Sequence, residues 1–477
     1  MSTRPAKFSV AIIGGGFSGA ILAAQLLRRG DPSISVAVVE KTSSVGRGLA
    51  YGTDCSSLLL NVRARNMSAF PDDPNHFLRW AQSNHDPSTG PGSFLPRAVY
   101  GRYVQAVLNE SVQLAGNDRM EWVKDEAWQT YPTDDGMEVK LGSGRRLLAD
   151  RVVLALGNFP PSDPLAAWNA KAGSRYFFNP WSASTFEGLE SLRDVLLVGS
   201  GLTSVDVAVQ LREGGCPGTI HILSRRGLLP QPHKSTDACL PFWNNSSPKR
   251  ISGLLRLVRQ QVEGAQKQGI EWQSVFDSLR PQVAQIWQSL SDPERRRFLR
   301  HVRPYWEVHR HRAAPQIAQS IGEQISGGQI KVHAGRITGY TDGSRVKVTY
   351  HDRMSGKVNS ISVDRVINCT GPESDCRRLD NRLITSLLAS GSTRPDPLFL
   401  GLDISPDGAL VNQDGTISDS LFAVGPIRKG SVWESTAVPE LREQIHRLVE
   451  HLLNSDLMPA SMALTDPCGA DTLVRRF

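Results

Sequence analysis

The chain has 477 residues, 40% of them hydrophobic and 21% charged, which is typical of a soluble globular protein with room for two or three domains. Its formal charge of +7 is modest for this length, and basic residues are interleaved with acidic ones, so small anionic ligands are expected rather than nucleic acid. The sequence contains neither about 18 consecutive apolar residues nor a charged leader with an apolar stretch, which predicts no membrane span, no signal peptide and a cytoplasmic location.

The six cysteines show no CxxC spacing. The sequence therefore predicts neither a metal knuckle nor a dithiol redox centre, and no bound metal is expected.

The first segment has the pattern of a strand, a tight glycine turn and a helix. The apolar run 8–13 leads into Gly14-x-Gly16-x-x-Gly19. The first glycine permits the turn, the second lets the backbone approach a pyrophosphate, and the third lets the helix lie close to the strand. Glu40 ends the next apolar run, at the offset where a carboxylate binds a ribose hydroxyl. Together these features predict a dinucleotide site.

A glycine-rich loop over residues 45–52 and a segment over 58–71 come next. The backbone of such a segment can approach a flat ring closely and offer hydrogen bonds to its edge, as a flavin requires. Asn61, Met67 and Ser68 are the expected contacts. A plain surface loop is the alternative.

Periodicity predicts further helices and strands up to a break at residues 158–161. The third of these strands ends at Gly157, where the chain is expected to pass beside a cofactor. The helices are expected over 74–84 and 97–114, and the strands over 121–123, 137–141 and 151–157.

A second nucleotide motif follows the predicted strand 194–198. Gly199 and Gly201 form the turn, but Ser204 stands where the third glycine is expected, so this copy is the weaker one. The next predicted strand, 219–223, is followed by Arg225 and Arg226 instead of an acid, which suits a 2′-phosphate and favours NADP over NAD. The alternative is that both arginines belong to a solvated turn.

Residues 233–327 change to a helical pattern that contains His309, Arg310 and Arg312. These side chains are expected either to hold an anionic or planar substrate or to form ion pairs at a domain interface. His309 and His311 diverge on a helix, which argues against zinc. Helices are predicted over 251–263, 272–279, 283–290 and 293–300.

Strands return over 330–333, 345–350 and 361–363. The run 364–372 repeats the ending of a strand in a glycine, at Gly371. A last strand leads to Gly425, a loop contains Thr436, an amphipathic helix covers 440–453, and residues beyond about Pro459 are predicted to form a tail.

The order of these motifs resembles the flavoproteins with two dinucleotide-binding domains, such as flavin-containing and N-hydroxylating monooxygenases, over nearly the whole chain. More closely, residues 48–52, 60–64, 67–74, 425–430 and 433–436 are similar to a bacterial family usually labelled only FAD/NAD(P)-binding protein. The resemblance implies FAD on the first domain, with Gly425 near its ribitol and flavin, and a nicotinamide nucleotide on the second domain. Its members include urate hydroxylases and enzymes that oxidise amino groups.

Two positions depart from the wider flavoprotein patterns. Pro426 stands where an Asp is usual, which implies a different ribitol contact. The Baeyer–Villiger pattern has a His four residues before a Trp, but Phe177 precedes Trp181 here, which argues against that reaction.

We therefore expect an α/β fold with two Rossmann-like dinucleotide-binding domains, in which an NADP domain is inserted into an FAD domain, plus a helical insertion. The predicted boundaries are 1–185 and 369–477 for the FAD domain, 186–232 and 329–368 for the NADP domain, and 233–328 for the insertion.

The expected activity is that of an FAD-dependent, NADPH-oxidising monooxygenase that uses O₂ to hydroxylate a small polar, anionic substrate such as urate or an amino acid. Asn61 and Arg63 are expected to face the flavin ring, and Arg310 and Arg312 to contact the substrate. Two alternatives stay open: an NADPH:acceptor flavin oxidoreductase that inserts no oxygen, and a flavin-based redox-sensing module.

Overall fold

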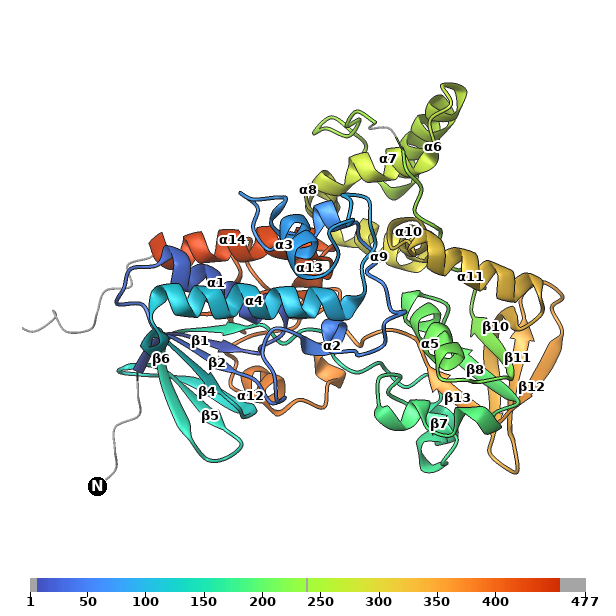
Figure 1. The fold of residues 1–477 in the computed structure, drawn as a ribbon, viewed down its shortest axis with the longest axis horizontal. Coiled ribbons are helices and arrows are strands. Elements are labelled where there is room, and N and C mark those ends of the chain that lie inside the picture. Colours follow the sequence, from blue (N-terminus) through green and yellow to red (C-terminus); the bar gives the residue numbers. More distant parts are fainter. Residues whose placement is uncertain (1–6, 237–238, 455–477) are drawn as a thin grey trace, which may run out of the picture.

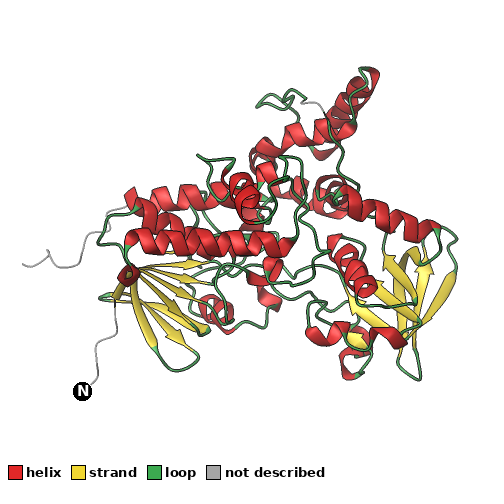
Figure 2. Ribbon diagram, viewed as in Figure 1, coloured by secondary structure: helices red, strands yellow, loops and turns green. Residues whose placement is uncertain are grey.

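The strands of the chain form two separate sheets (Figure 1). The computed structural model describes residues 7–236 and 239–454. Figure 2 shows the two sheets at opposite ends of the long axis, with helices covering the first sheet and filling the region above and between the two. Among the described residues no helix is long and apolar enough to cross a membrane.

The first sheet has the order β14-β15-β6-β1-β2-β3, with a hairpin of β4 and β5 attached to β6. Its β1, β2, β3, β6 and β15 are parallel, whereas β14, β4 and β5 join antiparallel. The strands are β1 (Lys7–Ile13), β2 (Val36–Val39), β3 (Met120–Val123), β4 (Ala127–Thr133), β5 (Gly136–Leu141), β6 (Arg146–Leu154), β14 (Ala409–Val411) and β15 (Ile417–Ala423).

Alternate residues of β1 face two different cores. Val10 and Ile12 pack under α1, α4 and α14, while Ala11 and Ile13 pack on the opposite face with α12. Burial on both faces explains why β1 and β2 are continuous apolar runs. The helices around this sheet are α1 (Phe17–Arg29), α2 (Gly48–Tyr51), α3 (His76–Asn84), α4 (Arg97–Ala115), α12 (Arg382–Ala389), α13 (Lys429–Val432) and α14 (Val438–Asn454).

The second sheet has the order β12-β11-β10-β9-β8-β13-β7. Strands β7 to β10 and β13 are parallel, while β11 and β12 form an antiparallel extension. Its elements are β7 (Tyr176–Phe177), β8 (Asp194–Val198), α5 (Leu202–Glu213), β9 (Thr219–Ser224), α11 (Pro315–Ser326), β10 (Ile330–Thr341), β11 (Val346–Asp352), β12 (Val358–Val363) and β13 (Arg365–Asn368).

A helical unit lies between β9 and α11 in the sequence. It projects from the body in Figure 1, with α6 at its outer end, and it packs against Trp433 of the last segment. It contains α6 (Ile251–Lys267), α7 (Trp272–Leu279), α8 (Val283–Ser289), α9 (Asp292–His301) and α10 (Arg303–Arg310). Short 3₁₀ turns cover Ala64–Asn66, Asn117–Arg119, Ala166–Trp168, Ala170–Ala172, Ala183–Phe186, Leu189–Ser191, Arg280–Gln282, Cys376–Arg378 and Pro426–Arg428.

The predicted α/β architecture of two dinucleotide-binding units and a helical insertion is confirmed. One detail differs, because β7 precedes residue 186, where the second unit was expected to begin, and yet pairs with β13 of the second sheet. The strands β4, β7 and β14 and the helices α2, α12 and α13 were not predicted. The helices α10 and α11 lie in the predicted helical region 233–327, but no range was predicted for either. The predicted tail beyond Pro459 lies outside the described residues.

Candidate functional site

The first glycine turn joins β1 to α1 and contains Gly14, Gly16 and Gly19. Gly14 has a φ of +107°, and a Cβ there would lie 2.3 Å from the Ala155 carbonyl oxygen. A Cβ on Gly19 would lie 1.9 Å from the Gly14 carbonyl oxygen. A larger residue is therefore excluded at both positions. Around Gly16 the space is open, because a Cβ there would meet only the Gly48 Cα, at 3.6 Å.

The start of α1 suits a phosphate group. Gly16 is its N-cap residue and supplies no side-chain hydrogen bond, and the first turn holds no acidic residue. The free N–H groups and the positive end of the helix dipole are thus left for an anion.

Glu40 stands beside this turn, at the end of β2. Its Oε2 accepts a hydrogen bond from the Gly15 N–H at 2.7 Å, and its Oε1 accepts one from the Thr42 N–H at 2.8 Å. A carboxylate can accept about four hydrogen bonds. Glu40 can therefore still accept hydrogen bonds from ribose hydroxyls next to the pyrophosphate position. Together, the free N–H groups at the start of α1 and the Glu40 carboxylate fit an adenine dinucleotide.

The second glycine turn joins β8 to α5 and repeats the geometry of the first. Gly199 has a φ of +116°, and a Cβ there would lie 2.3 Å from the Cys369 carbonyl oxygen. Gly201 is the N-cap residue of α5, again without a side-chain hydrogen bond or an acid in the first turn. The buried Ser204 hydroxyl donates to the Gly201 carbonyl at 2.8 Å, so the serine fits where a glycine is usual.

The chain leaves the first domain after β6 and returns to it after β13, and these two crossing segments lie side by side. Each glycine turn packs on the carbonyl that follows a strand, Ala155 after β6 and Cys369 after β13. Gly157 and Gly371 come two residues later with φ of +66° and +85°, and a Cβ on either would meet open space. Pro161 and Pro372 then form an isolated antiparallel bridge.

Arg225 and Arg226 follow β9 directly, next to the second turn. The Ser200 hydroxyl of that turn lies 2.7 Å from the Ser224 hydroxyl at the end of β9. Arg225 is exposed and forms no ion pair among the described residues, whereas Arg226 places its guanidinium 5.6 Å from the Tyr305 ring centroid. The pair lies where a nucleotide ribose would follow the α5 N-terminus.

The predicted flavin-facing segment is partly buried. Met67 packs in the core of the first domain, and the buried Ser68 hydroxyl bonds to the Asp73 carbonyl at 2.6 Å. These two side chains therefore brace the loop. Gly425 has a φ of +96° and lies close to the start of α1, and Thr436 is exposed just before α14 begins.

A basic cluster joins this segment to the helical insertion. The chain at residues 231–233 pairs with Ala313, next to Arg312, and His233 Nε2 donates to the Asn61 carbonyl at 2.9 Å. Arg63 donates from Nη2 to the Lys234 carbonyl. Burial and the charges of Arg312 and Arg63 lower the pKa of His233 to about 3, so its ring is neutral at physiological pH.

Arg312 is the buried cation of this cluster. Its side chain is 2% exposed, and its Nη2 pairs with Asp277. Its Nε and Nη1 are buried without a hydrogen-bond partner. A buried donor without an acceptor is costly, which makes these two atoms candidates for contact with a bound anion.

Arg310 and His309 have protein partners instead. Arg310 Nη2 lies 3.1 Å from Glu434 Oε2 and 3.0 Å from Glu440 Oε1. Burial alone would raise the pKa of Glu440, but its hydrogen bond with Arg280 and the charges of Arg280 and Arg310 lower it to about 2. The His309 ring packs 4.8 Å from the ring of Trp272. For these two residues the geometry favours the ion-pairing and packing interpretation over substrate contact.

Sequence reasoning missed His233, Asp277 and Glu440 as parts of this site. In the sequence, His233 marked only the start of the insertion. Asp277 and Glu440 lie in helices, and the sequence does not show which face of each helix points to the cluster. A buried ion pair between Arg97 on α4 and Asp206 on α5, at 2.7 Å, was also missed, and it ties the two dinucleotide-binding units together.

Comparison with known proteins decides the nature of the first unit. A family model described as FAD-NAD(P)-binding matches residues 11–159. These residues form an FAD-NAD(P)-binding domain. The match covers the glycine turn, Glu40 and the crossing at Gly157. No curated protein matches the chain by sequence.

Solved structures confirm the fold over nearly the whole chain. An ornithine hydroxylase of Pseudomonas aeruginosa has a TM-score of 0.62 at 15% identity, covering 94% of this chain and 99% of its own. L-lysine 6-monooxygenase of Pseudomonas syringae has 0.65 at 16%, covering 93% and 99%. The FAD-bound cadaverine monooxygenase of Erwinia amylovora has 0.65 at 12%, covering 98% and 100%. The chain therefore has the fold of flavoproteins with two dinucleotide-binding domains.

Proposed function

We propose that the chain is an FAD-dependent, NADPH-oxidising monooxygenase that hydroxylates a small polar, anionic substrate. The observation that carries the proposal is that one chain combines two glycine turns with free helix N-termini and a buried arginine that has unpaired N–H groups. Both turns pack on adjacent chain crossings, and Arg312 lies in the segment that pairs with residues 231–233 beside the flavin-facing loop.

The first turn would hold FAD. Gly14, Gly16 and Gly19 shape the pyrophosphate site at α1, and Glu40 receives the adenosine ribose hydroxyls. Asn61 and Gly425 lie on the side of the ribitol and ring. Pro426 has no carboxylate to offer the ribitol, so the backbone of this loop must make that contact.

The second turn would hold NADPH. Gly199, Gly201 and Ser204 form the pyrophosphate site at α5, and the exposed Arg225 meets the 2′-phosphate with a charge-assisted bond. Arg226 lies against Tyr305 and gives the phosphate a second positive charge nearby.

The flavin, when bound, supplies hydride acceptance and oxygen activation, so this chain needs no nucleophile or metal of its own. Its residues bind, orient and exclude water. The ion pair of Arg97 and Asp206 links the two domains.

The proposal that the substrate is an anion depends on the charges of the basic cluster. Arg312 offers two unpartnered N–H groups and Arg63 adds a second guanidinium, whereas the neutral His233 contributes no charge. A carboxylate or a purine anion complements this set. The solved relatives named for ornithine and lysine act on amino acids, and the one named for cadaverine acts on a diamine without a carboxylate. Amino acids and urate are thus the first compounds to test.

A steady-state assay with NADPH, O₂ and a panel of amino acids, purines and aromatic acids tests the proposal. We expect one class of anion to accelerate NADPH loss and to yield an equal amount of hydroxylated product. NADPH loss that gives only hydrogen peroxide or a reduced acceptor would instead support the flavin oxidoreductase. Negligible turnover with every compound would support the redox-sensing module.

A further inference from the structure

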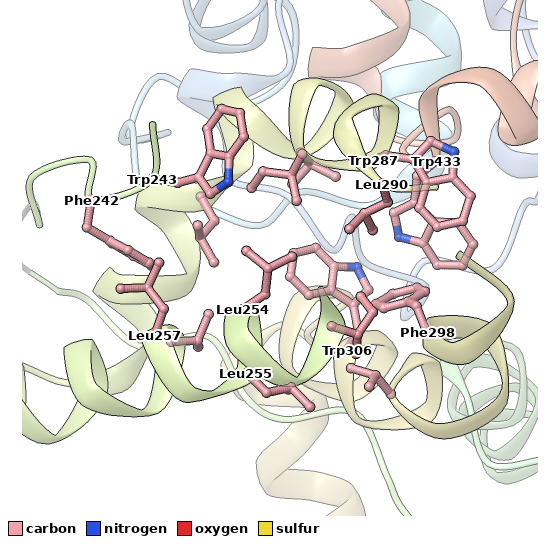
Figure 3. Close-up of a pocket in the computed structure, with 16 residues that line it drawn as sticks. Phe242, Trp243, Leu254, Leu255, Leu257, Trp287, Leu290, Phe298, Trp306 and Trp433 are labelled. Carbon is pink, nitrogen blue, oxygen red and sulfur yellow. The ribbon is translucent and has the colours of Figure 1, made fainter. Parts of the chain in front are cut away.

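The helical insertion and Trp433 of the last segment line a half-open cavity whose side chains are all apolar or aromatic (Figure 3). Its volume is about 100 Å³. Figure 3 shows Trp287, Trp433 and Phe298 together at one end and Leu254, Leu255 and Leu257 of α6 along one side. Binding sites for small ligands are concave and mostly apolar, so this cavity is a candidate site.

The lining offers little to a polar ligand. Trp287 Nε1 already donates to the Gly430 carbonyl at 2.7 Å, and Trp306 Nε1 donates to Glu434 Oε1 at 3.2 Å. A water molecule needs two to four polar partners, and the backbone of an inserted peptide would be left without hydrogen bonds. The complementary occupant is therefore a hydrocarbon group.

The volume of the cavity limits the size of the ligand that can bind in it. An apolar cavity of roughly 150 Å³ binds benzene, so this one suits a slim ring or a short alkyl chain. A helix of a partner protein would not fit, and a second copy of the chain would have to cover a far larger area, roughly 800 Å² on each side.

The outer wall is partly exposed to solvent. Leu254, Leu255 and Val258 of α6 are only half-buried, and α6 stands at the outer end of the projecting unit (Figure 1). The inner wall is strained, because the buried Trp433 has a φ of +61°, which is unfavourable for a bulky residue. This backbone places the indole against Trp287, with 5.0 Å between ring centroids.

Two of the helices that line the cavity have an excess of basic residues. Helices α6 and α9, which both line it, carry seven lysines and arginines against three aspartates and glutamates. Arg259 and Arg300 are exposed and form no ion pair among the residues that the structure describes. A negatively charged head group would be attracted to this surface.

We propose that the cavity binds the hydrocarbon part of a small alkyl or aryl carboxylate, whose carboxylate stays at the basic surface of α6 and α9. The proposal does not depend on the reaction carried out at the flavin junction.

Tryptophan fluorescence of the FAD-loaded full chain tests the proposal, since four of the ten tryptophans line the cavity. At constant ionic strength, we expect sodium hexanoate to change the emission saturably and hexylammonium to bind at least tenfold more weakly. A linear response to hexanoate would overturn the site. Equal binding of hexylammonium would overturn the assignment of a carboxylate.

Two substitutions and a control sharpen the test. Leu254→Phe fills the cavity and should weaken hexanoate at least tenfold, whereas Leu254→Ala enlarges it and should shift the preference toward octanoate. Leu114→Phe makes the same change at a 73% exposed position on α4 and should leave binding unchanged. Flavin content and the melting temperature report whether each variant is folded. Unchanged hexanoate affinity in folded Leu254→Phe and an unchanged chain-length preference in Leu254→Ala would both contradict the proposal.

Discussion

Replacing Arg312 tests the proposed substrate anchor. The side chain is 2% exposed and has two N–H donors without partners, whereas its ion-pair partner Asp277 is 41% exposed. Asp277 would thus stay solvated after Arg312→Gln, and the loss should fall on the substrate. One charge-assisted hydrogen bond is worth about 1.5–3 kcal/mol, or roughly tenfold to a hundredfold in affinity. We expect the KM of an anionic substrate to rise by that factor with a smaller change in kcat, because an anchor binds ground and transition states alike.

The assay compares an amino acid with its decarboxylated amine, for example lysine with cadaverine, in the wild type and in Arg312→Gln. Arg353→Gln removes the same charge from an exposed position between β11 and β12 and serves as the control. The discrimination between the two compounds should collapse only in Arg312→Gln. An unchanged KM for the carboxylate, or an equal rise for both compounds, would refute the reasoning.

Other consequences follow from the cofactor sites and the buried histidine. Gly16→Leu should fill the open space next to Gly48 and yield folded but colourless protein, as judged by flavin content and circular dichroism. Arg225→Ala with Arg226→Ala should raise the KM for NADPH about tenfold to a hundredfold and that for NADH little, while an equal rise would make the pair structural. The pKa of His233 is about 3 when folded and about 6.5 when unfolded, so stability present above pH 6.5 should fall as the pH drops toward 3. His233→Asn should flatten that dependence in urea titrations, and an unchanged slope would show that the ring is not held neutral.

The sequence predicted those parts of the fold in which the local backbone conformation requires one residue type. Gly14 and Gly199 both need a positive φ and close contact with a carbonyl, so their spacing revealed both turns. Strand β4 was missed because only Ala127 and Thr130 of its seven residues are buried, which leaves almost no apolar alternation. Helix α11 was given no range of its own, because its isoleucines follow helical spacing but form only a narrow stripe on a polar sequence.

Residues of the candidate site were harder to assign because their roles depend on distant partners. Arg310 and Arg312 are two positions apart, but Arg310 meets Glu434 and Glu440 from the last segment of the chain, while Arg312 meets Asp277 of α7. Sequence spacing carries no information on which guanidinium is neutralised. The local sequence pattern therefore predicted where the cluster lies. Only the tertiary fold shows which of its arginines have acidic partners and which atoms are left unpaired.

The central claim is that FAD and NADPH act together on an anionic substrate, and a stoichiometric measurement tests it most directly. The FAD-loaded chain is first mixed with NADPH without oxygen, and then O₂ is admitted with the compound that most accelerates NADPH loss. We predict that NADPH bleaches the flavin and that each NADPH consumed gives about one hydroxylated product. A flavin that NADPH does not reduce, or hydrogen peroxide as the sole product with every anion tested, would contradict the account.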